Sequence, residues 1–116
     1  MANPFEAAFV GLALTNAEIL EHQVNLYFPR AYIAVYNPIT IQRGQHRTPM
    51  AAPEFPSTLS SVVGESLRSV EAQANHNVVL VFESGARLEI STNPIDYSGP
   101  EAFSAQGPDG QLFVEQ

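Results

Sequence analysis

The tripeptide Asn-Pro-Ile occurs twice, in VYNPIT at residues 35–40 and in STNPID at residues 91–96, and each copy follows an apolar stretch. Proline cannot donate a hydrogen bond to a β-ladder, and it disfavours helix at the residue before it. We therefore expect each copy to end a strand as a corner, after which the isoleucine turns back onto the core. This structural interpretation is favoured over a binding motif.

The similarity between the two regions extends backwards through three apolar blocks. Residues 9–14 (FVGLAL) align with 62–67 (VVGESL), 24–28 (VNLYF) with 78–82 (VVLVF), and 31–35 (AYIAV) with 86–90 (ARLEI). The offset grows by one at each step, and the slips fall between blocks, where turns tolerate insertions. The sequence thus predicts an internal duplication with repeats at about 3–39 and 57–95, and this period suits one supersecondary unit per copy.

Each repeat is predicted to begin with a short helix. Residues 3–6 (NPFE) combine a capping residue, proline at the first helical position and glutamate three residues after the cap. Gly11 stands where a C-terminal glycine would end this helix. In the second repeat, Ser57 is the expected cap and Gly64 the expected end.

Three strands are predicted to follow each helix as an antiparallel meander. Val24, Leu26 and Phe28 alternate along the first block, as expected of a strand, and Val78, Leu80 and Phe82 alternate along the matching block of the second repeat. The expected strands are 14–19, 24–28 and 32–36 in the first repeat and 67–72, 78–82 and 87–91 in the second.

Two further segments lie outside the repeats. Residues 42–56 contain three prolines and little periodicity, which is typical of a loop. Residues 102–115 contain two short strand-like runs around the turn sequence GPDG at 107–110, which predicts a final hairpin. The chain is therefore expected to be one mainly β domain spanning 1–116, with two equivalent three-stranded sheets packed as a sandwich or closed as a small barrel.

Composition limits the classes of function. The chain has 116 residues, no cysteine, no lysine and a net charge of −7 from twelve acidic residues and five arginines. Such a charge disfavours nucleic-acid and anionic-membrane binding and permits a basic protein partner. The absence of cysteine removes disulfides and thiolate chemistry, and the N-terminus has no basic signal region. We expect a cytoplasmic protein that lies off the membrane.

A few polar residues are candidates for chemistry between the repeats. His22 and His76 occupy matching turn positions, and Glu18 and Glu71 match across the copies. If they converged, they could form a small-ligand site or an acid–base pair of a hydrolase. Solvated turn and strand positions explain them more simply, and no spacing for a metal site, cofactor loop or activated serine is present. No catalytic residue is assigned, and the sequence favours a protein that is not an enzyme.

Three tyrosines of the first repeat suggest an interaction surface instead. Tyr27, Tyr32 and Tyr36 stand where the second repeat has valine, arginine and serine, and alternation places Tyr32 and Tyr36 on one outward face. Tyrosine is enriched at protein interfaces because it buries a large area at low entropy cost. Either these residues form a docking or homodimer face, or the N-terminal helix, the loop or the final hairpin covers them.

The order of these motifs resembles a group of small bacterial proteins of unknown function. VNLYF…AYIAVYNPITI, LSSVVGESLRSVEA, VVLVFESGARLEI and SGPEAF…GPDGQLFV are similar to their YNP strand corner, G-x-x-V unit, hairpin and terminal GPEA segment. The likeness runs from about Val24 onward and concerns turns and core positions, so it implies a fold and no catalytic residues. Some small acidic proteins of this kind are suspected immunity or accessory factors, which implies a non-enzymatic role with a protein partner or a second copy.

Overall fold

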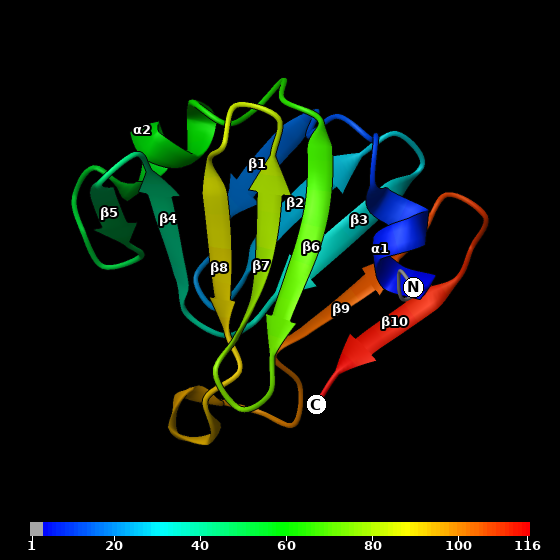
Figure 1. Cartoon of the computed structure of the whole chain (residues 1–116). Coiled ribbons are helices and arrows are strands. Elements are labelled where there is room, and N and C mark those ends of the chain that lie inside the picture. The colour runs from blue at the N-terminus through cyan, green and yellow to red at the C-terminus, as the bar shows by residue number, and fades with distance from the viewer. Residues whose placement is uncertain (1–3) are drawn as a thin grey trace.

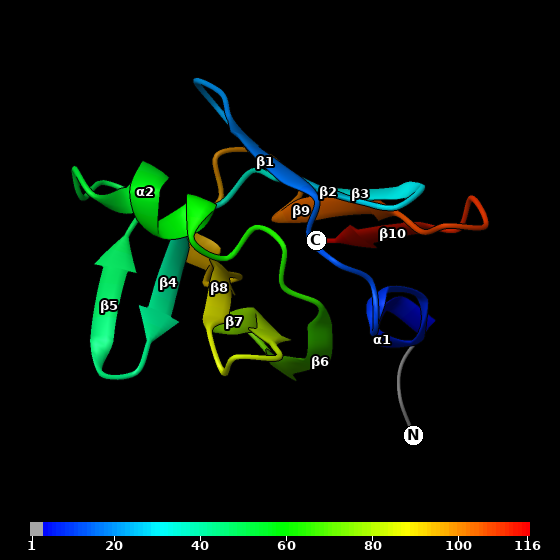
Figure 2. The same cartoon turned by 90° about the horizontal axis from the view of Figure 1, so that it is seen from above.

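Two antiparallel five-stranded sheets pack face to face (Figures 1 and 2). This computed structural model describes residues 4–116. Sheet 1 is ordered β1 (Asn16–Ile19), β2 (Val24–Phe28), β3 (Ala31–Val35), β9 (Phe103–Gln106) and β10 (Leu112–Glu115). Sheet 2 is ordered β5 (His46–Pro49), β4 (Ile39–Arg43), β8 (Arg87–Ser91), β7 (Asn77–Phe82) and β6 (Leu67–Gln73). Alternate apolar side chains of both sheets fill the space between them, so the prediction of a mainly β fold is confirmed.

Each sheet is larger than the sequence predicts. The meanders β1-β2-β3 and β6-β7-β8 are present, but a hairpin from the other half of the chain extends each one. Strands β4 and β5 join sheet 2 beside β8, while β9 and β10 join sheet 1 beside β3. The predicted three-stranded sheets are therefore wrong in size, because these long-range pairings leave no local signal.

Residues 42–56, predicted as a loop, contain the end of β4, the whole of β5 and the start of a helix. Thr48 is the one buried residue of β5, and its neighbours Arg47 and Pro49 face solvent at the sheet edge. Proline is tolerated on an edge strand, where its missing N–H is not needed. The prediction failed because a short polar edge strand shows no apolar alternation.

The two sheets share one register as well as one strand order. Val24 lies opposite Val35 in sheet 1, and Val78 lies opposite Ile90 in sheet 2. The outer pairs match too, since Val35 lies opposite Phe103 and Ile90 lies opposite Ile39. In both sheets, the last strand of the meander therefore pairs in the same register with a strand from the other half of the chain.

The two Asn-Pro-Ile copies differ after the corner. Ile39 starts β4 and is fully buried, as expected, whereas Ile95 lies in the 3-10 helix η1 (Pro94–Asp96) and is 86% exposed. The expected return of Ile95 to the core is wrong, because Phe103 occupies the equivalent position in the fold. Asn37 is buried and donates a hydrogen bond of 2.8 Å to the Ser91 carbonyl, which joins the two corners.

The two halves of the chain cross where residues 11–14 pair with residues 64–67, and each of these segments begins with a glycine. Gly11 donates to the Leu67 carbonyl at 2.8 Å, and Gly64 donates to the Leu14 carbonyl at 2.7 Å. Both glycines have φ near +90° to +100°, a conformation that costs glycine little. Ala13 and Ser66 form an antiparallel bridge between these bonds. The hydrogen-bond pattern is the same when the two segments are exchanged.

Two short helices close opposite open sides of the sandwich (Figure 2). Helix α1 (Pro4–Phe9) packs beside β6, and helix α2 (Phe55–Ser60) packs against β1, β4 and β5. The predicted cap Ser57 is wrong: Glu54 precedes the helix, and the Ser57 hydroxyl donates to its carbonyl. The predicted cap Asn3 lies outside the described residues. No helix within residues 4–116 is long and apolar enough to cross a membrane.

Candidate interaction surface

The outer face of sheet 1 carries aromatic, amide and apolar side chains. Strand alternation turns Leu26 and Ile33 into the core and leaves Tyr27 and Tyr32 outside, directly opposite each other across β2 and β3. Tyr36 lies beyond the end of β3 on the same side. We call Tyr27, Tyr32 and Tyr36 the tyrosine face. The hairpin β9-β10 extends this surface with Ser104, Gln106, Leu112 and Val114.

Tyr27 is held in place by polar neighbours on the outer face. Its hydroxyl donates to the Glu18 carboxylate at 2.9 Å and accepts a hydrogen bond of 3.3 Å from the Asn25 amide. The bond to Glu18 raises the pKa of the Tyr27 phenol, since it favours the protonated hydroxyl, and the Asn25 bond acts in the opposite direction. The ring is therefore fixed in the free protein, which lowers the entropy cost of contact.

Tyr36 is fixed in a similar way at the other end of the face. Its hydroxyl lies 3.0 Å from the Ser104 hydroxyl oxygen on β9. Beside it is a shallow depression of about 300 Å³, lined by His22, Gln23, Tyr36, Glu101 and residues 98–100. The depression thus places an aromatic ring and a carboxylate together at the surface, a combination that suits an arginine or lysine side chain.

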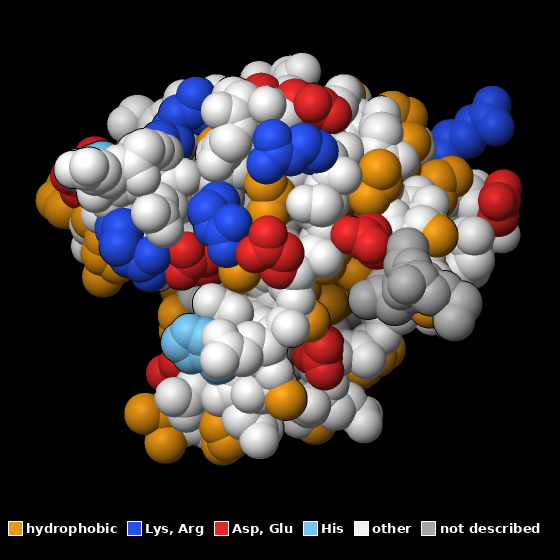
Figure 3. Space-filling view, viewed as in Figure 1, with side chains coloured by type: hydrophobic (Ala, Val, Ile, Leu, Met, Phe, Trp, Pro, Cys, Tyr) orange, Lys and Arg blue, Asp and Glu red, His pale blue; other side chains and the backbone are white. Residues whose placement is uncertain are grey.

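The outer face of sheet 2 has the opposite character. Arg87 donates to Glu71 at 2.8 Å, and Arg47 makes a two-pronged contact with Glu89 at 2.8 and 3.0 Å. These ion pairs lie over Val79, which is buried although it points away from the core. Figure 3 shows acidic and basic side chains interspersed over this face. The charges of this face therefore nearly balance, and these four charged side chains are paired with one another.

In the part of the chain that the structure describes, several glutamates beside the tyrosine face have no arginine partner, in contrast to the paired glutamates of sheet 2. Arg43, Arg47 and Arg87 are paired with glutamates, and the chain has only five arginines against twelve acidic residues. Within residues 4–116, Glu18 and Glu101 form no ion pair, and Glu21 meets only the exposed His22 at 3.6 Å. These three glutamates lie on or beside the tyrosine face. An aromatic centre with an acidic border is the result.

The four residues proposed for chemistry between the repeats do not form one site. Glu18 lies on the outer face of sheet 1, while Glu71 lies on the outer face of sheet 2 and pairs with Arg87. The contact with Arg87 lowers the pKa of the Glu71 carboxyl. The expected convergence of Glu18 and Glu71 is therefore wrong, because both point outward on opposite layers.

The two histidines lie at separate hairpin tips. His22 lines the surface beside Tyr36 and Met50, whereas His76 lines a different cleft with Thr40 and Glu89. Within residues 4–116, no group of three histidine or acidic side chains has a geometry that could hold a metal ion. The histidines and carboxylates thus contribute separately to the surface.

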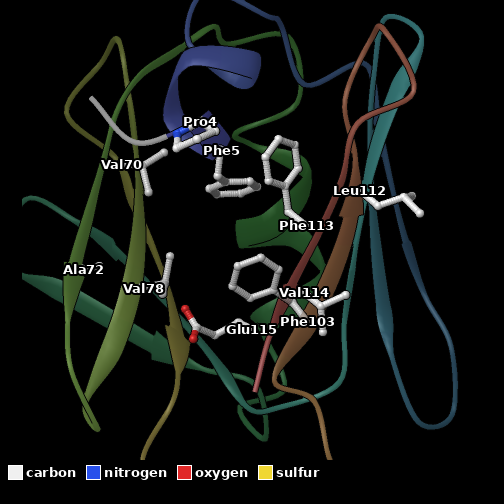
Figure 4. Close-up of a pocket in the computed structure, with 10 residues that line it drawn as sticks. All are labelled: Pro4, Phe5, Val70, Ala72, Val78, Phe103, Leu112, Phe113, Val114 and Glu115. Carbon is white, nitrogen blue, oxygen red and sulfur yellow. The ribbon is translucent and has the colours of Figure 1, made fainter. Parts of the chain in front are cut away.

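A cleft opens between the two sheets on the side covered by α1. Its volume is about 420 Å³, and its apolar walls come from α1, β6, β7, β9 and β10. In Figure 4 the rings of Phe5, Phe103 and Phe113 gather on one side of it, while Val70 and Val78 face them from the other. Among the described residues that line the cleft, Glu115 is the only charged one. The cleft follows the free edge of β10.

The sequence indicated that Tyr32 and Tyr36 share an outward face, but it did not indicate which residues of other strands lie beside them. Ser104, Gln106 and Val114 belong to the same outer face because β9 pairs with β3 across a long sequence separation. The alternation in FSAQ and LFVE indicates which residues of the hairpin share a side. It does not indicate which strand the hairpin joins.

Comparison with protein-family models, with curated proteins and with solved structures found no match for this chain.

Proposed function

We propose that this protein is a non-enzymatic interaction module that binds a basic protein through the tyrosine face. The supporting observation is the contrast between the two outer faces. On sheet 2 the charges are paired with one another, whereas on sheet 1 ordered tyrosines lie beside glutamates that have no arginine partner. A face with an aromatic centre and a charged border has the anatomy of a protein interface.

The composition of the face supports a protein partner. Tyrosine, serine and asparagine are among the residues that antibody binding loops favour, since they combine contact area with adaptable hydrogen bonding. Tyr32 is 39% exposed, and it lies between the ordered Tyr27 and the outward-facing Gln106. A flat sheet face of this kind supplies contact area without a deep pocket.

The charge of the border supports a basic partner. Glu101 lines the depression beside Tyr36, and Glu21 lines a neighbouring depression that Tyr36 also borders. An arginine or lysine of the partner placed there would contact the ring face and a carboxylate together. Complementary charge of this sort speeds association and makes it sensitive to salt.

The test compares capture of protein partners by the wild-type chain and by the double variant Tyr32→Ala, Tyr36→Ala. We expect the wild type to retain a basic protein at low salt, and we expect the double variant to lose at least tenfold in affinity for that protein. Titration calorimetry with the purified partner at two salt concentrations then measures the charge contribution. Binding should weaken as salt rises.

A matched control is available on the opposite layer. Gln73 and Asn77 lie opposite each other on the outer face of sheet 2, so Gln73→Ala, Asn77→Ala alters a cross-strand pair away from the tyrosine face. This control should bind as the wild type does. Undiminished binding by the tyrosine variant, or an equal loss in the control, would contradict the proposal.

We also propose that the chain arose by duplication of a unit that comprised one helix and five strands. The two halves have equivalent strand orders and registers, and their crossing segments exchange the same hydrogen bonds. In this proposal the last hairpin of each unit packs in the sheet of the other, as in a swapped dimer. The aromatic character of sheet 1 and the charged character of sheet 2 then reflect divergence of two equivalent faces.

We further propose that this interaction module acts in the cytoplasm as an immunity-like or accessory factor. The absence of cysteine and the excess of acidic residues support such a role, since an acidic surface can occupy a basic site on its target. The partner test above applies directly, because an immunity-like protein predicts one tight basic target. Capture of several unrelated basic proteins with equal affinity would count against it.

A further inference from the structure

The free edge of β10 is the least protected of the four sheet edges. Natural edge strands are shielded by charge, proline or covering elements, because their unpaired backbone groups bind other strands. Strand β5 carries Arg47 and Pro49, and α2 packs against both β5 and β1. Strand β6 carries Arg68 and Glu71, and the Glu6 carboxylate accepts the Val70 N–H at 2.7 Å.

Within residues 4–116, the central residues of strand β10, which are LFV at 112–114, carry no charge or proline and pair with no strand other than β9. Leu112 is 76% exposed and Val114 is 51% exposed, both on the outer face of sheet 1. Phe113 points inward to the cleft and contacts the Phe5 ring at 5.4 Å between centroids. An apolar strand with exposed side chains and a free backbone edge is a template for another strand.

The hydrogen-bond pattern defines which backbone groups are free. The carbonyls of Gln111 and Glu115 accept bonds from Gly107 and Ala102, so these positions face β9. Because the positions of an antiparallel ladder alternate, Leu112 and Val114 direct their N–H and C=O groups to the open edge. A partner strand must therefore bond to Leu112 and Val114.

We propose that this strand is β10 of a second copy, paired antiparallel about a twofold axis at Phe113. Leu112 then lies opposite Val114 of the second copy, which joins two hydrogen-bonding positions and two apolar side chains on one face. The two Phe113 side chains meet at the mouth of the apolar cleft. Glu115 lies opposite the uncharged Gln111, so the register brings no like charges together.

The charge pattern at this edge is compatible with a second copy. Each chain carries a net charge of −7, yet β10 brings only Glu115 to the contact, and Glu115 has no acidic residue opposite it. Association through the other apolar exposed segment of sheet 1, at Ile19 and Leu20, would bring Glu18 and Glu21 of both copies together. The β10 edge therefore offers a contact with less repulsion than the segment at Ile19 and Leu20.

The pairing yields one continuous ten-stranded sheet. A twofold axis perpendicular to the sheet keeps both outer faces on the same side, so the two tyrosine faces lie next to each other. If the tyrosine face binds a partner, as proposed above, the dimer presents it twice and gains avidity. The self-pairing itself does not depend on that function.

The test measures the solution mass of the purified protein by light scattering and sedimentation over a wide concentration range. We expect the wild type to approach twice its chain mass of 12.6 kDa. Leu112→Lys and Val114→Glu should each weaken self-association on the order of tenfold to a hundredfold, because each places a charge opposite an apolar residue. Both positions are exposed, so melting temperatures measured on dilute monomer should stay near the wild-type value.

The control is Ile95→Lys, which makes the same kind of change at an exposed residue of η1. This variant should dimerise as the wild type does. The register has its own test: an equimolar mixture of Leu112→Lys and Val114→Glu should recover the dimer, because the proposed pairing sets the two introduced charges opposite each other.

Three results would overturn the proposal. They are a wild-type protein that stays monomeric at the highest concentration, a dimer that survives both β10 variants, and a mixture that fails to recover the dimer. Failure of the tyrosine-face proposal would appear in partner binding and not in the solution mass. Tyr32→Ala, Tyr36→Ala should remain dimeric whether or not it binds a partner, whereas Leu112→Lys should keep one tyrosine face per monomer and lose only avidity.

Discussion

Arg43, at the end of β4, donates a hydrogen bond of 3.1 Å to Glu65 in the segment where the two halves cross. The Ser84 hydroxyl, in the β7-β8 turn, donates to the other oxygen of the same carboxylate. Glu65 therefore joins three separate parts of the chain. Its side chain is only 19% exposed, so solvent screens these contacts less than those of a surface pair.

We predict that Glu65 contributes to the loss of stability in acid. Burial acts to raise the pKa of its carboxyl, but the bonds from Ser84 and Arg43 outweigh burial and lower it below the usual 4.5. A lowered folded pKa gives stability that is present above the unfolded value and is lost as pH falls through the folded value. Glu65→Gln should cost about 1 kcal/mol at pH 7 and almost nothing in strong acid.

Denaturant titrations at several pH values would measure this difference. Glu83→Gln changes an exposed acid two residues before Gly85 in the same turn and should leave the free energy of unfolding at pH 7 nearly unchanged. An equal cost of Glu65→Gln at pH 7 and in acid would show that the side chain acts through packing alone.

Thr48 is expected to limit stability. It is 1% exposed, and its hydroxyl oxygen has no hydrogen-bond partner within the described part of the chain. Phe113 occupies the equivalent inward position in the other sheet, where it lies opposite Ala105 as Thr48 lies opposite Ile41. Thr48→Val keeps the shape and removes the unsatisfied group, so it should stabilise the protein by about 1 kcal/mol.

Thermal or denaturant unfolding of Thr48→Val would test this point. Thr40→Val on β4 is the matched control, since Thr40 faces outward and is only half-buried. The control should change stability little. A destabilised Thr48→Val would mean that the hydroxyl is satisfied in solution, for example by a buried water.

The sequence predicted several strands whose inward residues alternate as apolar, but it did not predict β4 and β5. The bounds of β2 and β8 agree with the alternation of Val24, Leu26 and Phe28 and of Leu88 and Ile90. Strand β5 was not predicted, because its one buried residue, Thr48, is polar. Strand β4 was not predicted although Ile39 and Ile41 are apolar, and the pairings of β4 with β8 and of β9 with β3 were missed because they join residues far apart in the chain.

The candidate surface shows the same division. Alternation alone places Tyr32 outward, and the structure agrees. The bonds of Tyr27 to Glu18 and of Tyr36 to Ser104 depend on strand neighbours, which only the register supplies. Equivalent positions in the repeats suggested that Glu18 and Glu71 converge, but equivalent residues of two facing sheets point in opposite directions when they lie on the outer surfaces.

We predict that glycine is the more stable residue at one position in the β2-β3 turn and at one position in the β7-β8 turn. Arg30 has φ of 59° in the β2-β3 turn, and Gly85 has φ of 94° in the β7-β8 turn. Only glycine adopts this region without a steric cost, although it also loses more entropy on folding. Arg30→Gly should stabilise the protein by about 0.5 kcal/mol, and Gly85→Arg should destabilise it by about 1 kcal/mol.

Denaturant unfolding of both variants would measure these changes. Arg30 forms no ion pair within residues 4–116, so Arg30→Ala serves as the control that removes the charge and keeps the strained conformation. It should lie close to the wild type. A gain from Arg30→Ala equal to that from Arg30→Gly would assign the effect to the side chain and not to the backbone.

The last prediction concerns Tyr27, whose pKa reports on the order of the tyrosine face. The bond that its hydroxyl donates to Glu18 favours the protonated phenol and raises its pKa above 10, while the Asn25 bond partly offsets this. Glu18→Gln removes the negative acceptor, so the pKa of Tyr27 should fall toward 10. A raised folded pKa gives stability that is present below 10 and is lost as pH rises through the folded value.

Carbon NMR of the tyrosine ring carbons resolves each phenol and would follow this titration, with Tyr27→Phe used to assign the signal. Glu21→Gln is the matched control, because Glu21 lies at the hairpin tip and makes no bond to Tyr27. A fall in Glu18→Gln alone would establish that the Tyr27 ring is held by its neighbour in the free protein. An unchanged Tyr27 pKa in Glu18→Gln would show that the ring is not fixed before contact, which would remove the pre-organisation on which the proposed interface depends.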